Sequence, residues 1–200
     1  MRDAVVSSAA TREAILDATD RLLARYGFRK MTIDDLAKEV GIGKGSVYLH
    51  FPSKEEIALS HIDRMIDRLK ETMRKIADGT GNVEEKLKAM LVERVTYRFD
   101  SVQNYTQSLD ELLSGLRTSL LDRRKRYFEA EAKILADVVT EGQRNDVFKS
   151  GDPFDLASTL VSATNSLLPY SLSAYELGDR QVVAQRAAKT ADLLIRGLKC

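Results

Sequence analysis

The chain has 200 residues, and a content of 44% hydrophobic and 30% charged residues allows both a buried core and a charged surface. One cysteine, Cys200, excludes an intrachain disulfide and a thiolate cluster, and the net charge of +1 offers no overall attraction for nucleic acid. No segment has the apolar length of a membrane span or a secretory signal, so we expect a cytoplasmic protein.

The first third of the chain predicts four helices after a short irregular segment. Residues 1–10 carry small and polar side chains without helical period, so we expect a flexible N-terminal arm. Apolar side chains then recur at helical spacing as far as Tyr26, and Gly27 is expected to end that helix. Thr32 and Asp35 form a capping box for the next helix. The predicted helices cover about 11–26, 33–40, 44–50 and 54–77.

The remaining two thirds also show helical periodicity. Asn82 is expected to cap one helix, and Asp152 and Pro153 to begin another, which has to stop or kink at Pro169. Further helices are predicted within 100–115, over about 119–143, and from Gly178 to the end. We find no strand pattern or repeat. The sequence therefore predicts an all-α fold of about nine helices.

One stretch has the residue spacing of a helix-turn-helix. Ala37 supplies the small side chain where two helices cross, and Gly41, four residues later, tolerates the positive φ of a tight turn. Val47, six residues after the glycine, returns a branched apolar group to the crossing. We therefore predict a helix-turn-helix domain at 11–53, followed by a larger helical domain at 54–200.

The short helix at 44–50 has an outward face suited to reading DNA. Val47 and Phe51 take its core side, which leaves the other side chains largely exposed. A glycine in this helix allows the backbone to approach a duplex, and nearby cations without an intervening acid give the segment a positive field. The contacts with phosphates, base edges or a thymine methyl are expected from Lys44, Tyr48 and Leu49.

The run from Gly27 to Glu56 closely resembles the signature of the tetracycline-repressor (TetR) family of transcriptional regulators. The sequence Lys-Gly-Ser-Val-Tyr-Leu-His-Phe-Pro-Ser-Lys at 44–54 is the most specific part, and the resemblance covers about residues 11–60. It implies that the residues matching the family's DNA contacts touch DNA, mostly its backbone. These residues are Thr32, Lys44, Gly45, Ser46, Tyr48, His50 and Lys54.

The resemblance also implies two roles for the larger helical domain. Family members are typically homodimers joined through their last two long helices, and a cavity among the central helices binds an inducer. We expect a dimer interface, with ordinary intrachain core as the alternative, at Leu160, Leu167, Val183, Ala187, Ala191 and Leu194. We expect the cavity to be lined by Phe99, Tyr105, Tyr127, Phe128, Asn165 and Tyr170. Charge is sparse on these inward faces, which favours a mainly apolar or aromatic ligand.

The leading hypothesis is a repressor that binds a palindromic operator as a homodimer and is released by a small ligand. The alternative is a constitutive DNA-binding protein with a solid C-terminal core and no sensing pocket. An enzyme is disfavoured, because we find no nucleophile–base pair, no phosphate-binding glycine loop and no metal-ligand spacing. No metal or cofactor is expected.

Three features of the sequence also have a plain structural interpretation. Tyr48 can pack under its own helix, and His50 is equally well explained as a phosphate contact or as a capping group. The run Arg123–Arg126 resembles a second nucleic-acid patch. It lies inside a predicted helix beside acidic residues, so a solvated, salt-bridged face is favoured.

Overall fold

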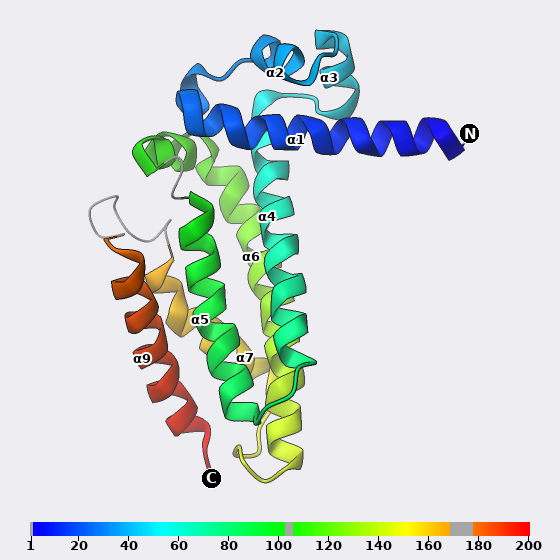
Figure 1. Ribbon diagram of the computed structural model, residues 1–200. Coiled ribbons are helices and arrows are strands. Elements are labelled where there is room, and N and C mark those ends of the chain that lie inside the picture. Colours follow the sequence, from blue (N-terminus) through cyan, green and yellow to red (C-terminus); the bar gives the residue numbers. More distant parts are fainter. Residues whose placement is uncertain (1, 103–105, 169–177) are drawn as a thin grey trace. The chain divides into compact units, whose positions relative to one another are not determined.

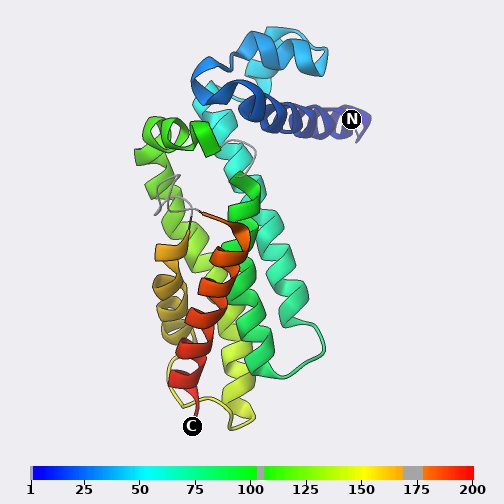
Figure 2. The same ribbon diagram turned by 60° about the vertical axis from the view of Figure 1, so that its left-hand side comes forward.

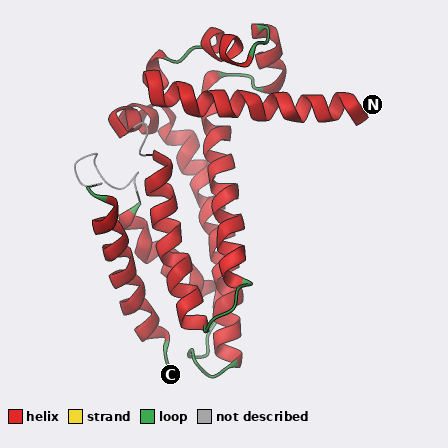
Figure 3. Ribbon diagram, viewed as in Figure 1, coloured by secondary structure: helices red, strands yellow, loops and turns green. Residues whose placement is uncertain are grey.

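Helices make up nearly all of the chain that the computed structural model describes. It describes residues 2–102, 106–168 and 178–200, with side chains at 8–102, 114–168 and 178–200. Figure 3 shows helices joined by loops, and one isolated antiparallel bridge joins Phe148 to Lys199. Within the described residues there are eight α-helices and one 3₁₀-helix. The predicted all-α fold is confirmed.

Two compact units make up the chain. Unit 1 comprises Met1–Met65 with Asn104–Leu120, and unit 2 comprises Ile66–Gln103 with Leu121–Cys200. The first division, between Met65 and Ile66, falls inside the helix Lys54–Ala77, whereas the predicted domain boundary lies at the break before Lys54. The first turns of that helix carry the fully buried Ile57, so they belong to the core of unit 1.

The first helix, α1 (Arg2–Lys30), extends further than predicted at both ends. The irregular arm expected at residues 1–10 is wrong for residues 2–10, which continue the helix. Alanine and arginine there favour helix, and no glycine or proline interrupts it. Gly27 has φ 73° and ψ 168°, so the helix bends at the predicted stop, and the helical segment then ends at Lys30.

The remaining N-terminal helices are α2 (Ile33–Val40), α3 (Lys44–His50) and α4 (Lys54–Ala77). Figure 1 shows α2 and α3 beside α1. Side chains spaced three and four residues apart on α1 meet apolar side chains of the later helices to form the core of unit 1. Its fully buried members include Ile15, Leu16, Leu23, Met31, Leu36, Val47, Phe51 and Ile57.

Unit 2 is a bundle of helices that run side by side in both Figure 1 and Figure 2. It contains the second half of α4, α5 (Val83–Val102), much of α6 (Thr106–Arg144), α7 (Pro153–Thr164), the 3₁₀-helix η2 (Asn165–Leu167) and α9 (Arg180–Leu198). The core comes from all the α-helices of the unit and includes Leu69, Leu87, Leu91, Leu135, Val139, Leu160 and Ala191.

Two helix boundaries in unit 2 follow from local chemistry. Asp152 caps α7, since its carboxylate accepts hydrogen bonds from the N–H groups of Phe154 at 2.8 Å and Asp155 at 3.0 Å. The helical run ends before Pro169, and Leu168 is extended with ψ 148°, as a residue before proline prefers. Both confirm the prediction for this segment.

The long helix α6 differs from the prediction, which placed a short helix within 100–115 and a separate long one from about 119. The structure has a single helix from Thr106 to Arg144. Gly115 is the residue that most disfavours helix near the junction of the two predicted helices, and one glycine costs only about 1 kcal/mol relative to alanine. None of the described helices is long and apolar enough to cross a membrane.

Candidate nucleic-acid interface

A tight bend joins α2 to α3, as the sequence predicts. Gly41 has φ 77°, and its N–H donates to the carbonyl of Ala37 at 2.9 Å. The N–H of Ile42 donates to the same carbonyl at 2.9 Å, so two amides close the end of α2. Val47 is fully buried. The two helices are therefore locked at the bend, and the side chains of α3 opposite Val47 are presented outward.

The start of α2 is fixed by the predicted capping box. The hydroxyl of Thr32 accepts from the N–H of Asp35 at 3.1 Å, and the N–H of Thr32 donates to the Asp35 carboxylate at 3.1 Å. The same hydroxyl also donates to that carboxylate at 2.6 Å. Thr32 is exposed, but its hydroxyl proton is already used within the cap.

The outward face of α3 carries most of the predicted DNA contacts. The side chain of Tyr48 is 48% exposed and that of Leu49 is 85% exposed, so Tyr48 does not pack under its own helix. Lys44 and Gly45 are also exposed, and Ser46 and His50 are partly exposed. An aliphatic side chain as open as Leu49 on a rigid helix is available for contact with a thymine methyl.

Acidic residues of α2 reduce the positive field that the sequence predicts. The ammonium of Lys44 lies 2.8 Å from a carboxylate oxygen of Asp34, and Nε of Arg21 lies 2.9 Å from one of Glu39. The hydrogen bond that the Lys44 ammonium donates to Asp34, together with the negative charge of Asp34, raises the pKa of Lys44. Arg21 and Lys44, which lie in acid-free stretches of the sequence, are therefore paired with acidic residues of α2 in the structure.

Lys54, the last predicted DNA contact, has a structural role. Its ammonium donates to the carbonyls of Phe28 at 3.1 Å and Arg29 at 3.4 Å, and it lies 4.7 Å from the centre of the Phe28 ring. A cation at this position satisfies carbonyls that the end of α1 leaves free. Contact of Lys54 with a phosphate remains a prediction.

A buried charged cluster occupies the interior of unit 2, and the sequence analysis missed it. We call Arg94, Arg98, Glu131 and Thr164 the arginine cluster. Nε of Arg94 donates to one oxygen of Glu131 at 2.6 Å, and Nη2 of Arg98 donates to the other. Nη1 of Arg94 donates to the hydroxyl of Thr164 at 2.6 Å. The expectation of sparse charge on the inward faces of these helices is therefore wrong.

Periodicity contained a signal for this cluster. Arg94 and Arg98 lie on the same helical stripe as Leu87, Leu91 and Val102, which are all buried. Charged residues at core positions of an amphipathic helix indicate a buried polar network. The sequence of α5 therefore indicates a buried polar network at these two positions.

The carboxyl group of Glu131 remains ionised in the cluster. Burial has the largest single effect and raises its pKa, but the charges and hydrogen bonds of Arg98 and Arg94 together outweigh burial and lower the pKa. The side chains of Arg94 and Glu131 are fully buried. α5 and α6 are therefore joined by a desolvated ion pair rather than by apolar contacts alone.

Two of the predicted ligand residues lie against this cluster. Nη2 of Arg94 donates to the side-chain carbonyl of Asn165 at 2.6 Å, and its guanidinium lies 5.3 Å from the centre of the Phe128 ring. Phe99 is 2% exposed, and Tyr127 is partly buried. Tyr105 and Tyr170 lie outside the described residues.

Most of the residues predicted for a dimer interface lie instead in the core of their own chain. Leu160, Val183, Ala187 and Ala191 are at most 3% exposed, so they have no surface to offer a partner. Leu167 and Leu194 are partly exposed. The small residues of α9 permit close packing within unit 2, which was the alternative interpretation. The large apolar side chains that are exposed on α7 and α9 are Phe154, Val182 and Leu193.

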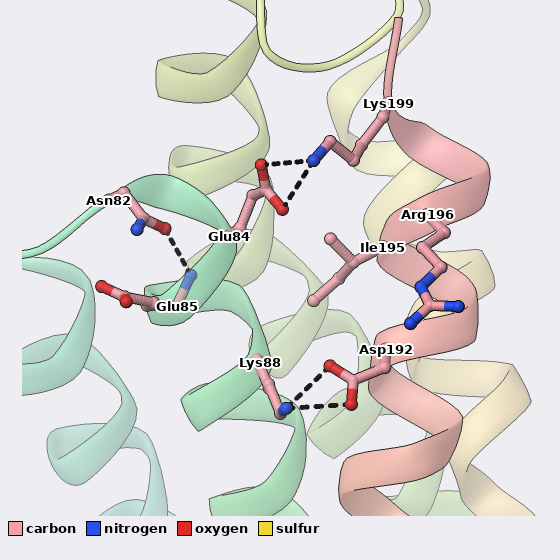
Figure 4. A pocket seen from close by; sticks show the side chains of 8 residues that line it. All are labelled: Asn82, Glu84, Glu85, Lys88, Asp192, Ile195, Arg196 and Lys199. Carbon is pink, nitrogen blue, oxygen red and sulfur yellow. Dashed lines mark hydrogen bonds and ion pairs between the residues drawn. The ribbon is translucent and has the colours of Figure 1, made fainter.

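A surface pocket of about 400 Å³ lies between the start of α5 and the end of α9 (Figure 4). Most of its charged lining residues form ion pairs with one another: Lys88 pairs with Asp192 at 2.7 Å, and Lys199 pairs with Glu84 at 2.9 Å. Ile195 is its only apolar lining residue. The pocket has neither an apolar interior nor a clear excess of one charge, so it does not resemble a site for an apolar ligand.

The basic run Arg123–Arg126 has partners along its own helix. Lys125 lies 3.9 Å from a carboxylate oxygen of Glu129, and the guanidinium of Arg124 lies 5.6 Å from the Phe128 ring centre. The Lys125 side chain is 82% exposed. These contacts agree with a solvated helix face rather than with a second nucleic-acid patch.

The interface region matches a known protein family. Residues 15–60 match the model of the family described as bacterial regulatory proteins, tetR family. Over a longer stretch, the chain is 28% identical over 156 residues to the HTH-type transcriptional repressor KstR2 of Mycobacterium tuberculosis, and the match covers 76% of each chain. It is 26% identical over 153 residues to the fatty acid metabolism regulator protein of Bacillus subtilis, covering 75% of this chain and 77% of that one.

The fold is also similar to that of solved regulator structures. The crystal structure of a transcriptional regulator from Cytophaga hutchinsonii superposes with a TM-score of 0.79 and 24% sequence identity, covering 94% of this chain and 98% of the other. This likeness extends through both units, so the helical arrangement is shared beyond the residues that match the family model.

Proposed function

Since the chain belongs to the tetR family of bacterial regulatory proteins and is a DNA-binding transcriptional regulator rather than an enzyme, we propose that it is a ligand-responsive repressor. It binds a palindromic operator as a homodimer, and a small molecule bound in unit 2 releases it. The observation that carries the proposal is the face of α3, where Lys44, Tyr48 and Leu49 are exposed while Val47 is fully buried. Such a face is rigid and can enter a major groove.

Repression, rather than activation, is supported by the relative from Mycobacterium tuberculosis, which is named a transcriptional repressor. The relative from Bacillus subtilis is named a regulator of fatty acid metabolism. A small molecule with an aliphatic or aromatic part fits that relationship and the aromatic side chains of Phe99 and Phe128 in unit 2.

The short length of α3 supports a homodimer. α3 has seven residues, so one copy reaches few base pairs, and pairing two half-sites supplies the missing affinity. The surface proposed for pairing is the exposed apolar side chains Phe154 on α7 and Val182 and Leu193 on α9. It replaces the buried residues that the sequence analysis assigned to this role.

The second candidate is a constitutive DNA-binding protein without a sensing site. The arginine cluster favours it in one respect, because hydrogen-bonded charged groups occupy the interior of unit 2. The two candidates differ in one measurable property: only the ligand-responsive repressor releases DNA when a small molecule binds.

Operator selection from genomic fragments, followed by fluorescence anisotropy over a series of salt concentrations, tests the DNA-binding proposal. Lys44→Ala is expected to weaken binding and to reduce the salt slope by about one unit, as loss of one phosphate contact does. Tyr48→Ala is expected to weaken binding as well. Lys125→Ala, which removes an exposed lysine of unit 2, is the control and leaves affinity unchanged. Unchanged affinity in both α3 variants contradicts the assignment of the exposed face of α3 as the surface that contacts DNA.

A further inference from the structure

We propose that Arg12, on α1, is a further DNA contact of this regulator, and that its guanidinium binds a backbone phosphate beside the C-terminal end of α3. The inference rests on the proposed function, because it adds a residue to the DNA-binding surface assumed there. It starts from a contact between two helices of unit 1: the Arg12 guanidinium lies 4.8 Å from the centre of the Phe51 ring. Arg12 lies outside residues 15–60, which match the family model, and is not among the DNA contacts predicted from the sequence.

Phe51 connects Arg12 to the end of α3. It is the capping residue of that helix, and its N–H donates to the carbonyl of Val47 at 3.0 Å. The side chain of Phe51 is 1% exposed, so its ring is fixed in the core of unit 1. His50, for which the family resemblance implies a contact with the DNA backbone, directly precedes it and is partly exposed. An arginine stacked on this ring therefore lies close to the part of α3 where a phosphate is expected.

Stacking on a ring leaves the hydrogen-bond donors of a guanidinium available. The ring contacts the face of the guanidinium, whereas the five N–H donors lie around its edge in a planar fork that fits a phosphate. The Arg12 side chain is 45% exposed, so a molecule outside the protein can reach it. A cation that already rests on an aromatic ring loses less conformational freedom when DNA binds.

The acidic residues near Arg12 make closer contacts with another arginine. The carboxylate of Glu13 lies 4.0 Å from Arg12 but 3.1 Å from Arg64 of α4. Arg64 also lies 2.7 Å from a carboxylate oxygen of Asp17. The side chain of Arg64 is 12% exposed, so it serves to join α4 to α1. Glu13 is itself exposed and at the limit of ion-pair distance, so it competes only weakly with a phosphate for Arg12.

Arg12 is better suited to this role than Lys54, the cation that was predicted to contact DNA just after α3. The ammonium of Lys54 donates to the carbonyls of Phe28 and Arg29, and a phosphate has to compete with these acceptors. The stack of Arg12 on Phe51 imposes no such competition, because the ring and a phosphate contact different parts of the guanidinium.

Anisotropy titrations over a series of salt concentrations, with the operator obtained by selection, test the contact. Arg12→Gln is expected to lower affinity about five- to tenfold near 0.1 M salt and to reduce the salt slope by about one unit, as loss of one phosphate contact does. Arg12→Lys, which retains the charge without the planar fork, is expected to lose less affinity and to keep the slope. Arg196→Gln, at an exposed arginine of α9, is the control and keeps both. A wild-type slope in Arg12→Gln overturns the inference.

Neutral phosphate analogues separate a DNA contact from a purely structural role of Arg12 on Phe51. Each phosphate in and beside the half-sites is replaced in turn by a methylphosphonate, and binding of wild-type protein and Arg12→Gln is compared as a double-mutant cycle. At one position or more, the wild-type protein is expected to lose affinity by about the same factor as Arg12→Gln, and the variant is expected to lose nothing further. Equal losses in both proteins at every position overturn the inference.

Failure here is distinguishable from failure of the proposed function. Lys44→Ala and Tyr48→Ala test the exposed face of α3 on the same operator. A protein whose affinity falls in those two variants, but whose salt slope is unchanged in Arg12→Gln, retains the proposed function and loses this inference. A wild-type protein that binds no genomic fragment contradicts both.

Discussion

Lys44, one of the proposed DNA contacts, already has an acidic partner within the protein. Its ammonium is held by Asp34 at 2.8 Å, from the preceding helix. A DNA phosphate that approaches Lys44 has to replace this carboxylate and is repelled by it. Asp34 is therefore expected to weaken DNA binding, although it touches no DNA in the proposed interface.

Asp34→Asn is expected to raise operator affinity about two- to fivefold, in keeping with the modest strength of exposed ion pairs. Anisotropy titrations of the single variant and of Asp34→Asn combined with Lys44→Ala form a double-mutant cycle. The gain is expected to disappear in the double variant. A gain of equal size with and without Lys44 attributes the effect to general charge and contradicts release of this lysine.

At the scale of the element, the bend between α2 and α3 depends on one backbone conformation. Gly41 has φ 77°, and a Cβ built there meets no atom within 4 Å. Substitution at this position is therefore opposed by backbone strain alone and not by a clash. Gly45, on α3, is equally open but has no positive φ. The two glycines form a matched pair.

Gly41→Ala is expected to lower the free energy of unfolding by about 1–2 kcal/mol, the cost of a left-handed conformation for alanine. Gly45→Ala is expected to change it little or to raise it by about 0.5 kcal/mol, because alanine favours helix. Urea denaturation measures both. If the glycine in α3 is present for close approach of the backbone to DNA, Gly45→Ala also weakens operator binding while the fold is retained.

The ion pair between α5 and α6 gives a second prediction at this scale, on pH. The pKa of Glu131 is below its ordinary value of 4.5, and burial alone would raise it, so the two arginines control its ionisation. The unfolded chain therefore takes up a proton on Glu131 at a higher pH than the folded chain. The stability that this group contributes is present above its ordinary pKa and is lost as pH falls toward the folded pKa.

Urea denaturation between pH 7 and pH 3 tests this sign. Wild-type protein is expected to exceed Glu131→Gln in stability at neutral pH, because the variant removes the buried carboxylate charge that Arg94 and Arg98 share. The difference between the two proteins is expected to shrink below about pH 4.5 as Glu131 becomes protonated in the unfolded state. A difference that stays constant over the whole range contradicts a lowered pKa.

At the scale of the whole molecule, the proposed homodimer depends on which apolar side chains of α7 and α9 are exposed. Leu193 is 61% exposed on α9, although Ala187 and Ala191 on the same helix are fully buried. α9 therefore uses its small residues for its own chain and shows a larger aliphatic side chain outward. An exposed leucine of this kind is a natural contact in a two-fold interface.

Leu193→Glu is expected to convert a homodimer to monomer, because two-fold symmetry places charges of equal sign close together across the interface. Sedimentation velocity measures the change, and operator affinity is expected to fall with it. Leu121→Glu, at a leucine of α6 that is 42% exposed, is the control and keeps the wild-type assembly. A dimer that survives Leu193→Glu contradicts the proposed surface.

The helix-turn-helix could be predicted from the sequence because its determinants are local. The capping box of Thr32, the left-handed Gly41 and the buried Val47 lie within a few turns of one another, and all three are found as predicted. Hydrogen bonds and periodicity within one or two helices depend on neighbouring residues only. The sequence by itself therefore determined the fold class, the bend between α2 and α3, and which face of α3 is exposed.

Only the tertiary structure decided which distant residues meet. Lys44 and Lys54 are predicted from the sequence to contact DNA. In the structure, the ammonium of Lys44 meets Asp34 and that of Lys54 meets carbonyls of α1. Arg94 and Glu131 are 37 positions apart, and α9 packs its small residues inward. Such contacts depend on how separate helices pack, because the pattern of one helix shows which face is buried but not which side chain lies opposite.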